Sequence, residues 1–243
     1  MKRAILNLST LAALFLLIGC ASYYPQVVDI PLIQGKGDTR FNVGCFAAPE
    51  LNGKGDITPD EGYFKASLRH NVNFGFHGTL SVGVSDILAV QAYTSFDALL
   101  RCHLQGALGL YKGFENNTVI EMYGGGGFGT AGFWNLETDF YSLCFTQFNI
   151  GKTSVGNGNL DYGFGLKGGY VFNDYEEYNI HYSDKANKKN SWIIEPSAFI
   201  RFGGKKAKMN IMVNYMWADN IPKPYYFPLS IGMGLNYKFG KYK

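Results

Sequence analysis

The chain has 243 residues, of which 31 are Gly, 16% are aromatic and only 17% are charged, with a formal net charge of +3. This composition excludes a disordered chain, which would be rich in charge and poor in aromatic residues, and it disfavours a helical bundle, because Gly is costly inside helices. A mean hydropathy of −0.07 excludes a membrane protein built of several apolar helices, and the small net charge gives no reason to expect a nucleic-acid partner. What remains is a β protein, either soluble or a membrane barrel.

The first 19 residues have the features of a secretory signal peptide. Lys2 and Arg3 precede an apolar stretch that is too short to span a bilayer and ends in the sequence LIGC at Cys20. This ending resembles the bacterial lipobox, which implies cleavage before Cys20 and acylation of that residue. An ordinary signal peptide followed by a chance Cys is the alternative. We therefore expect three parts: a lipoprotein signal peptide over 1–19, an N-terminal lipidated tether over 20–37 and an outer-membrane β-barrel over 38–243.

Three further cysteines lie in the mature chain, at Cys45, Cys102 and Cys144. Their number is odd, and the sequence has no CxxC motif or Cys/His cluster, so neither a disulfide framework nor a zinc site is supported. We expect single thiols that serve as small apolar residues.

Apolar and polar residues alternate with a period of two through almost the whole mature chain. Residues 64–84 show the pattern best, with an apolar row on one parity and a polar row on the other. Such alternation predicts strands with one apolar and one polar face, longer than the five or six residues typical of soluble sheets. Ten segments fit: about 39–48, 63–84, 88–96, 102–111, 118–132, 140–151, 160–172, 191–202, 208–217 and 229–240.

This pattern predicts an all-β fold, a closed antiparallel transmembrane β-barrel of about ten strands. A spanning strand needs roughly 9–11 residues, and single-chain bacterial barrels have even strand counts. No Gly or Pro marks a turn between Asp97 and Arg101, so one strand over 88–111 would give nine; eight is the other alternative. Aromatic residues near strand ends fit interfacial girdles: Phe41, Phe96, Trp134, Phe172, Trp192, Trp217 and Phe239.

The connections alternate between long and short, as expected for long external loops and short periplasmic turns. If the lipidated N-terminus is periplasmic, the first strand runs outward. The external loops are then about 49–62, 97–101, 133–139, 173–190 and 218–228, and the periplasmic turns about 85–87, 112–117, 152–159 and 203–207.

Two parts of the mature chain resemble a known group of proteins. One is CASYYP from Cys20, followed by IPLIQGKGD from Ile30; the other is the pair FTQFNIG from Phe145 and IEPSAFIRFG from Ile194. They resemble small outer-membrane β-barrel lipoproteins of Bacteroidota-type bacteria, which are mostly of unknown function. The resemblance covers most of the mature chain and transfers no catalytic residue. The last strand is similar to the aromatic-rich insertion signal of such barrels, but the chain departs from it by ending in GKYK.

Charged and polar residues on the inward parity form the main candidate site. We expect them to pair with one another and fill the lumen, because an unpaired charge in a narrow interior is costly. A ligand-holding or channel role is the alternative. The row comprises Arg40, Arg69, His77, Asp97, Arg101, His103, Glu121, Lys167, Glu195 and Arg201.

His181, Ser183 and Glu195 are the one enzymatic candidate. Their order and spacing resemble the triad of outer-membrane lipid A deacylases, which implies Ser as nucleophile, His as base and Glu as the orienting group. Two observations count against this hypothesis. Glu195 shares the parity of the lumen row, whereas a lipid-cleaving site should open toward lipid, and His181 and Ser183 lie in a charged segment that a solvated loop explains.

The favoured interpretation is a non-enzymatic outer-membrane β-barrel lipoprotein with a structural, adhesive or narrow-channel role. The alternatives are a lipid hydrolase and a soluble periplasmic β protein held only by its lipid. We expect no cofactor and no metal. The expected partners are outer-membrane lipid and the barrel-insertion and lipoprotein-sorting machinery, with no nucleic acid; a small-molecule ligand is left open. The lipid-anchored N-terminus is expected on the periplasmic side.

Overall fold

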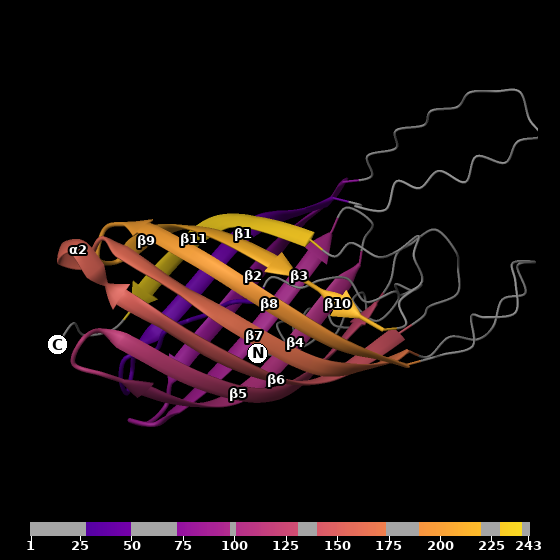
Figure 1. Cartoon of the computed structure of the whole chain (residues 1–243), viewed down its shortest axis with the longest axis horizontal. Coiled ribbons are helices and arrows are strands. Elements are labelled where there is room, and N and C mark those ends of the chain that lie inside the picture. Colours follow the sequence, from indigo (N-terminus) through magenta and orange to yellow (C-terminus); the bar gives the residue numbers. More distant parts are fainter. Residues whose placement is uncertain are drawn as a thin grey trace, which may run out of the picture.

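The chain forms one closed antiparallel barrel (Figure 1). The computed structural model describes residues 28–49, 72–97, 101–130, 140–173, 190–219 and 229–239. Its elements are β1 (Thr39–Pro49), β2 (Val72–Gly83), β3 (Leu88–Asp97), β4 (Cys102–Gly113), β5 (Thr118–Thr130), β6 (Phe140–Ser154), α2 (Val155–Gly158), β7 (Leu160–Asn173), β8 (Asn190–Gly203), β9 (Ala207–Tyr215), β10 (Trp217–Ala218) and β11 (Leu229–Phe239). Among these residues, no helix is long and apolar enough to cross a membrane.

Ten strands close the ring, because β10 continues β9. Asn214 pairs with Ser197 and Trp217 pairs with Ile194, so both segments share one register along β8. In that register Pro196 stands between the two paired stretches, and it has no N–H to donate to the ladder. β1 pairs with both β2 and β11, which completes the closure.

The predicted closed barrel of ten strands is therefore confirmed, and the counts of nine and eight are wrong. β3 and β4 are separate strands, and the N–H of Asp97 donates to the carbonyl of Arg101 across the turn between them. Most strand ends lie within two or three residues of the predicted ones. Residues 63–71, the first part of the second predicted strand, lie outside the described residues, and so does most of each long connection.

The two ends of the barrel differ in their connections. At one end, called here the turn end, strands are joined by 84–87, 114–117, 155–159 and 204–206, and β1 begins there. The opposite end, called the loop end, carries the long connections. In Figure 1 the turn end is on the left, beside α2, and the loop end is on the right.

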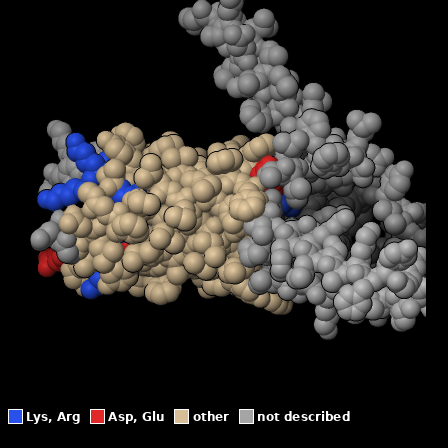
Figure 2. Space-filling model, turned by 90° about the horizontal axis from the view of Figure 1, so that it is seen from above, with Lys and Arg blue, Asp and Glu red and all other residues tan. Residues whose placement is uncertain are grey.

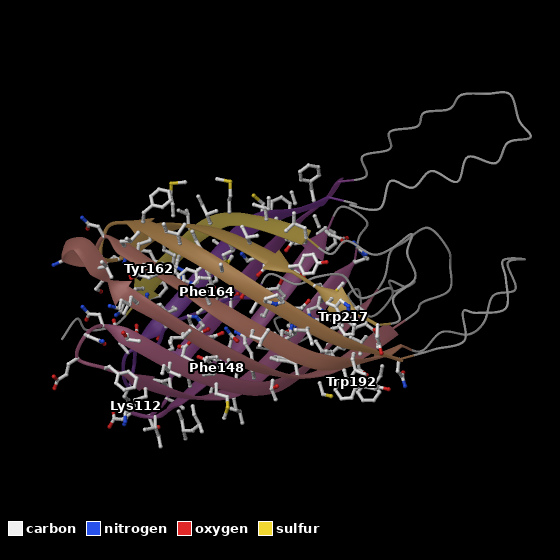
Figure 3. The ribbon with its side chains drawn as sticks, in the orientation of Figure 1. Lys112, Phe148, Tyr162, Phe164, Trp192 and Trp217 are labelled. Atoms are coloured by element: carbon white, nitrogen blue, oxygen red, sulfur yellow. The ribbon has the colours of Figure 1, made fainter. Side chains whose placement is uncertain are left out.

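The outer wall is apolar. Exposed and buried residues alternate along β3 and along β4 up to Tyr111, and the large exposed apolar residues of the wall are Leu, Val, Ile, Phe, Met, Trp and Tyr. Leu108 is 70% exposed and Phe164 is 64% exposed, and Figure 3 shows Phe148, Phe164, Trp192 and Trp217 on the outside. On the face seen in Figure 2, charged side chains lie only toward the two ends.

Aromatic side chains gather on this wall toward its ends. At the loop end, the ring of Tyr170 lies 4.7 Å from that of Trp192 and 4.8 Å from that of Phe172. At the turn end, the rings of Tyr237 and Phe239 lie 4.5 Å apart. Of the residues expected in the girdles, Trp134 lies outside the described residues.

Two inward-facing glycines explain how large rings fit the interior. Tyr123 lies over Gly109 and Tyr141 lies over Gly129, and in both cases a Cβ on the glycine would come within 2.5 Å of the ring. Both tyrosines are buried in the core, with 1% and 2% of their surface exposed. A side chain at either glycine would therefore displace a core tyrosine.

Candidate functional site

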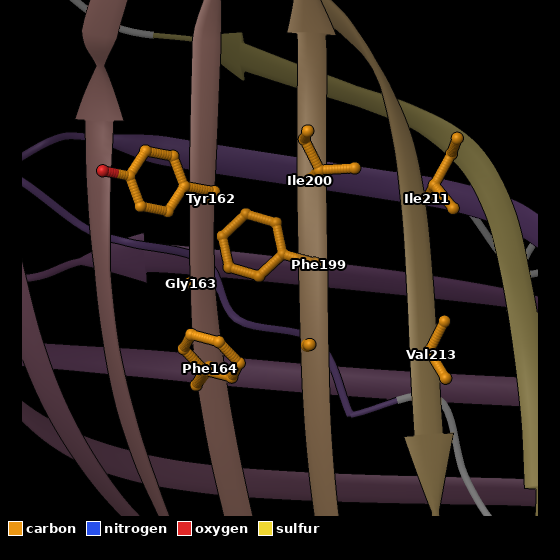
Figure 4. A pocket seen from close by; sticks show the side chains of 8 residues that line it. Tyr162, Gly163, Phe164, Phe199, Ile200, Ile211 and Val213 are labelled. Carbon is orange, nitrogen blue, oxygen red and sulfur yellow. The ribbon is translucent and has the colours of Figure 1, made fainter.

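In the part of the chain that the structure describes, the segment that precedes β1 lies inside the barrel and fills the turn-end half of the lumen. We call residues Val28–Asp38 the plug segment. From Asp38 at the turn end it runs into the barrel, and its deepest residues are buried: Ile30, Leu32 and Ile33 have no exposed surface and Val28 has 3%. In Figure 4 the segment is the thin indigo coil inside the barrel, behind the strands. The sequence predicts a tether over 20–37, whereas Val28 and the residues that follow it are packed inside the barrel.

Side chains of the wall bind the main chain of the plug segment from all sides. The carbonyl of Asp29 accepts hydrogen bonds from Gln147 of β6, at 2.9 Å, and from Gln91 of β3, at 3.4 Å. The N–H of Ile33 donates to Glu121 of β5 at 2.7 Å. Three further contacts come from β9, β8 and β1: Val28 N–H to Asn214 Oδ1, Arg201 to the Ile30 carbonyl and Arg40 to the Leu32 carbonyl. The wall therefore satisfies main-chain groups that would otherwise be buried without partners.

The carboxylate of Asp29 is the main charged contact of the segment. Its Oδ1 accepts from Asn42 Nδ2 at 2.9 Å and from Arg201 Nη2 at 3.2 Å, and both Asp29 and Arg201 are buried. The Nε and Nη1 atoms of Arg201 have no hydrogen-bond partner among the described residues. Asp29 thus provides the carboxylate that pairs with the buried guanidinium group of Arg201.

Apolar side chains of the segment fit the spaces left by glycines. A Cβ on Gly165 of β7 would lie 2.8 Å from the Cδ1 of Ile30, and a Cβ on Gly151 of β6 would lie 3.0 Å from the methyl groups of Leu32. Ile30 and Leu32 belong to a buried apolar cluster that also contains Phe46 and Phe199. The wall therefore recognises the shape of the segment as well as its polar groups.

The loop-end half of the lumen holds a second polar cluster. Lys167 of β7 pairs with Glu195 of β8 at 3.4 Å and donates to Gln105 of β4 at 3.1 Å. His103 hydrogen-bonds to Gln105 and stacks on Tyr141, with ring centroids 5.4 Å apart. A polar cavity of about 10 Å³ separates this cluster from the tip of the plug segment, lined by Val28, Asp29, Gln91, Tyr93, Gln105, Gln147 and Lys167. A space of this size holds about one water molecule.

Charges inside the barrel are nearly balanced once the plug segment is counted. The inward-facing cations of the described wall are Arg40, Arg101, Lys167, Arg201, Lys208 and Lys238, and its acids are Asp97, Glu121, Asp161 and Glu195. The plug segment adds two acids, Asp29 and Asp38, of which Asp38 pairs with Arg40 and Lys238, both at 3.5 Å. The wall alone therefore has more cations than acids, and the plug segment supplies the missing negative charge.

The structure places most of the residues expected in the lumen row inside the barrel. Arg40, His77, Asp97, Arg101, His103, Glu121, Lys167, Glu195 and Arg201 are buried, with at most 3% of their surface exposed. His77 has no hydrogen-bond partner on either ring nitrogen among the described residues. Arg69 lies outside the described residues, as do Cys20, His181 and Ser183. Within the described part of the chain, no group of three or more His, Cys, Asp or Glu could hold a metal ion.

The wall residues Asn42, Asp161 and Lys208 belong to the network as well, and they are not among the residues predicted for the lumen row. Lys208 pairs with Asp161 at 2.5 Å. The sequence does carry a signal for the plug segment: residues 27–33 read VVDIPLI, an apolar run with one acid. A tether in water has no reason to be that apolar.

The outer wall carries one shallow apolar groove of about 250 Å³ (Figure 4). Its lining comes from β7, β8 and β9: Tyr162, Gly163, Phe164, Ala198, Phe199, Ile200, Ile211 and Val213. The ring of Phe199, which is buried, packs against the inner side of Gly163, where a Cβ would lie 2.9 Å from it. None of these side chains is a catalytic acid, base or strong nucleophile. The three cysteines of the described chain, Cys45, Cys102 and Cys144, carry free thiols.

No protein-family model matches the chain, and no curated protein matches it. Solved structures with a weak likeness include the outer membrane protein OprG from Pseudomonas aeruginosa, at 14% identity over 88% of this chain and 100% of that chain, with a TM-score of 0.38. Ail, the attachment invasion locus protein of Yersinia pestis, is 11% identical over 84% and 99% of the two chains, with a TM-score of 0.30. A chain from the de novo design of transmembrane β-barrels is 11% identical over 85% and 100%, with a TM-score of 0.33. Values this low carry no argument about function, so the fold rests on the strand pairing described above.

Proposed function

We propose that this chain is a β-barrel of the bacterial outer membrane that is closed at rest by its own plug segment. Its proposed role in the cell envelope is non-enzymatic, either structural or adhesive. The observation that carries the proposal is the contrast between the two faces of the wall. The outer face is apolar along most of the length of the strands, and the inner face is polar and carries hydrogen bonds to the plug segment. A soluble protein would expose its polar face to water, whereas a membrane barrel places its apolar face in lipid.

The buried plug segment supports a closed barrel over an open channel. Its residues block the cross-section from the turn end to the middle of the lumen, and the polar cavity at its tip has room for about one water molecule. We therefore expect no steady ion current through the intact protein in a lipid bilayer.

We also propose that Cys20 is lipidated, which rests on the LIGC ending of the signal sequence. Replacing Cys20 by Ala should abolish incorporation of a labelled fatty acid and change the processing of the N-terminus. Unchanged labelling of the C20A protein would contradict lipidation and leave the barrel proposal intact.

Membrane integration is tested with the same variant. If the strands span the bilayer, C20A protein should stay in the membrane pellet after extraction with alkaline carbonate, because the apolar wall holds it there without any lipid anchor. A lipoprotein known to be held only by its acyl chains serves as the control and should be released by the equivalent Cys→Ala change. Release of the C20A barrel would favour the soluble, lipid-held alternative.

The hydrolase alternative gains no support from the described part of the chain. Glu195, its orienting residue, is buried in the lumen and paired with Lys167 at 3.4 Å. A carboxylate held there has its charge neutralised by a lysine on the neighbouring strand, on the face away from lipid. The test is lipid A acylation in cells that express the intact chain and the S183A variant; we expect no difference.

A further inference from the structure

We infer that the lumen is a latent pathway for small inorganic anions, and that Asp29 of the plug segment occupies the anion site of this pathway. The inference rests on the proposed closed membrane barrel and goes beyond it, since it assigns an ion class to the lumen once the plug segment has left. The carboxylate of Asp29 is held by the guanidinium group of Arg201 and the side-chain amide of Asn42. Donors of these two kinds also bind free anions.

The carboxylate of Asp29 occupies a site formed by donors of the wall. Arg201 and Asn42 donate to its Oδ1 from opposite parts of the wall, on β8 and β1. Arg201 still has its Nε and Nη1 groups without partners among the described residues. When Asp29 leaves, these donors face the lumen with no carboxylate at hydrogen-bond distance. An ion that replaces Asp29 must therefore be an anion.

The wall alone carries an excess of positive charge. Without the plug segment, the described inward-facing cations outnumber the acids, as set out above. Arg40 loses its contact with the Leu32 carbonyl when the segment leaves, and it lies 3.8 Å from Asp161, which Lys208 already pairs at 2.5 Å. Rings of Arg and Lys side chains select anions in pores. The middle of the emptied lumen therefore repels cations.

The width of the path is set by the plug segment and by the side chains beyond it. The plug segment is a single chain without strand structure, so its departure would leave a space about one polypeptide chain wide. Beyond the tip of the segment, side chains that include the stacked pair His103 and Tyr141 and Lys167 fill the interior, so an ion can cross that half only between them. A passage of these dimensions suits chloride or another small inorganic anion rather than a metabolite.

The test compares the full chain with a variant that lacks residues 28–37, each inserted in a planar bilayer with a KCl gradient. Folding of both is checked by strand content and by altered migration on an unheated gel. We expect no steady current from the full chain, and a current from the deletion variant whose reversal potential reports a chloride preference. Adding R40Q and R201Q to the deletion variant should remove that preference. A cation-selective or unselective current, or a folded deletion variant without current, would overturn the inference.

A synthetic peptide of residues 27–36, added to the deletion variant, can take the place of the deleted plug segment in the lumen. It should block the current of the deletion variant, and the same peptide carrying D29N should need a concentration about tenfold higher or more, because it cannot form the charge-assisted contact with Arg201. Equal block by the two peptides would contradict the role of Asp29.

A third variant keeps the test decisive if the deletion prevents folding. D29N in the full chain removes only the charge, and we expect brief openings with a chloride preference; folded D29N protein that stays silent would overturn the inference. K36Q, which changes an exposed residue of the same segment, serves as the control and should stay closed. A steady current from the unchanged full chain would contradict the closed-barrel proposal instead, whatever its ion preference.

Discussion

The two faces of each strand follow different rules, and β4 shows the difference within a few residues. On the outer face, Leu104, Leu108 and Leu110 are 46%, 70% and 49% exposed. These side chains require an apolar environment but no specific contact with one another. Inward, His103 and Gln105 are buried, and each depends on particular atoms of other strands. The outer face thus tolerates any apolar side chain, whereas the inner face requires defined partners.

The largest effect is expected where an inner partner is removed. Glu195→Gln takes the charge from the buried partner of Lys167, and the loss should lower the free energy of unfolding by about 3–5 kcal/mol, because a lysine is then left buried without its carboxylate. Urea unfolding of the refolded barrel in lipid vesicles, followed by tryptophan fluorescence, measures it. The double variant Glu195→Gln with Lys167→Met should recover part of the loss, and a full, undiminished loss in the double variant would argue against the pair.

An outward charge tests the environment of the other face. Leu108→Arg should cost about 2–4 kcal/mol if this position lies in the middle of a bilayer. Val84→Arg, which is also exposed and apolar but lies at the turn end, should cost about 0–1 kcal/mol. In water both changes would fall within about 0.5 kcal/mol of zero, because both positions are exposed. Equal, small effects would therefore speak against a membrane-spanning wall.

The alternation of period two explains why the strands could be predicted so closely. It is a local property, readable residue by residue, and it also assigned Glu195 to the lumen side. The plug segment could not be predicted in this way, because its binding site does not exist until closure brings Gln91, Gln147 and Arg201 around one point. The partner of Glu195 likewise depends on the β7–β8 register, which places Lys167 directly opposite. The sequence pattern thus predicts on which face of the wall a residue lies, whereas the residue that it contacts depends on the register between strands.

A smaller effect is expected where the wall makes room for the plug segment. Gly165→Ala would place a Cβ 2.8 Å from Ile30 Cδ1 and 2.7 Å from Ser197 Oγ, and it should cost about 1–3 kcal/mol. Gly168→Ala, on the same strand with nothing within 4 Å of its Cβ, is the matched control and should be neutral or slightly stabilising. The same unfolding assay measures both; a similar cost for the two would show that the close fit at Ile30 is unimportant.

The last prediction concerns the orientation of the barrel and has little expected effect on stability. An epitope inserted near Asn187 should be reached by antibody on intact cells, and one at Gly204 in the turn end should not, because long loops are expected outside. The same assay tests the side of the N-terminus. From Asp38 to Val28 the plug segment runs from the turn end toward the loop end, so we expect an epitope between Ala21 and Ser22 to be reached by antibody on intact cells, as at Asn187. If antibody does not reach it on intact cells, as at Gly204, the result would favour a periplasmic N-terminus.

The pairing of β1 with β11 has a consequence for the order of folding. β1 is the first strand along the described chain and β11 is the last, and Thr39 pairs with Phe239 between them. Every other pair of neighbouring strands in the ring is joined by a single connection. Pairings so distant in sequence form late, since closing a long loop costs more entropy than closing a hairpin. The plug segment directly precedes β1, so it is carried to the seam by the strand that completes the ring. It is therefore enclosed by the final step of assembly, and its escape afterwards is limited by the rate at which it can leave through an end.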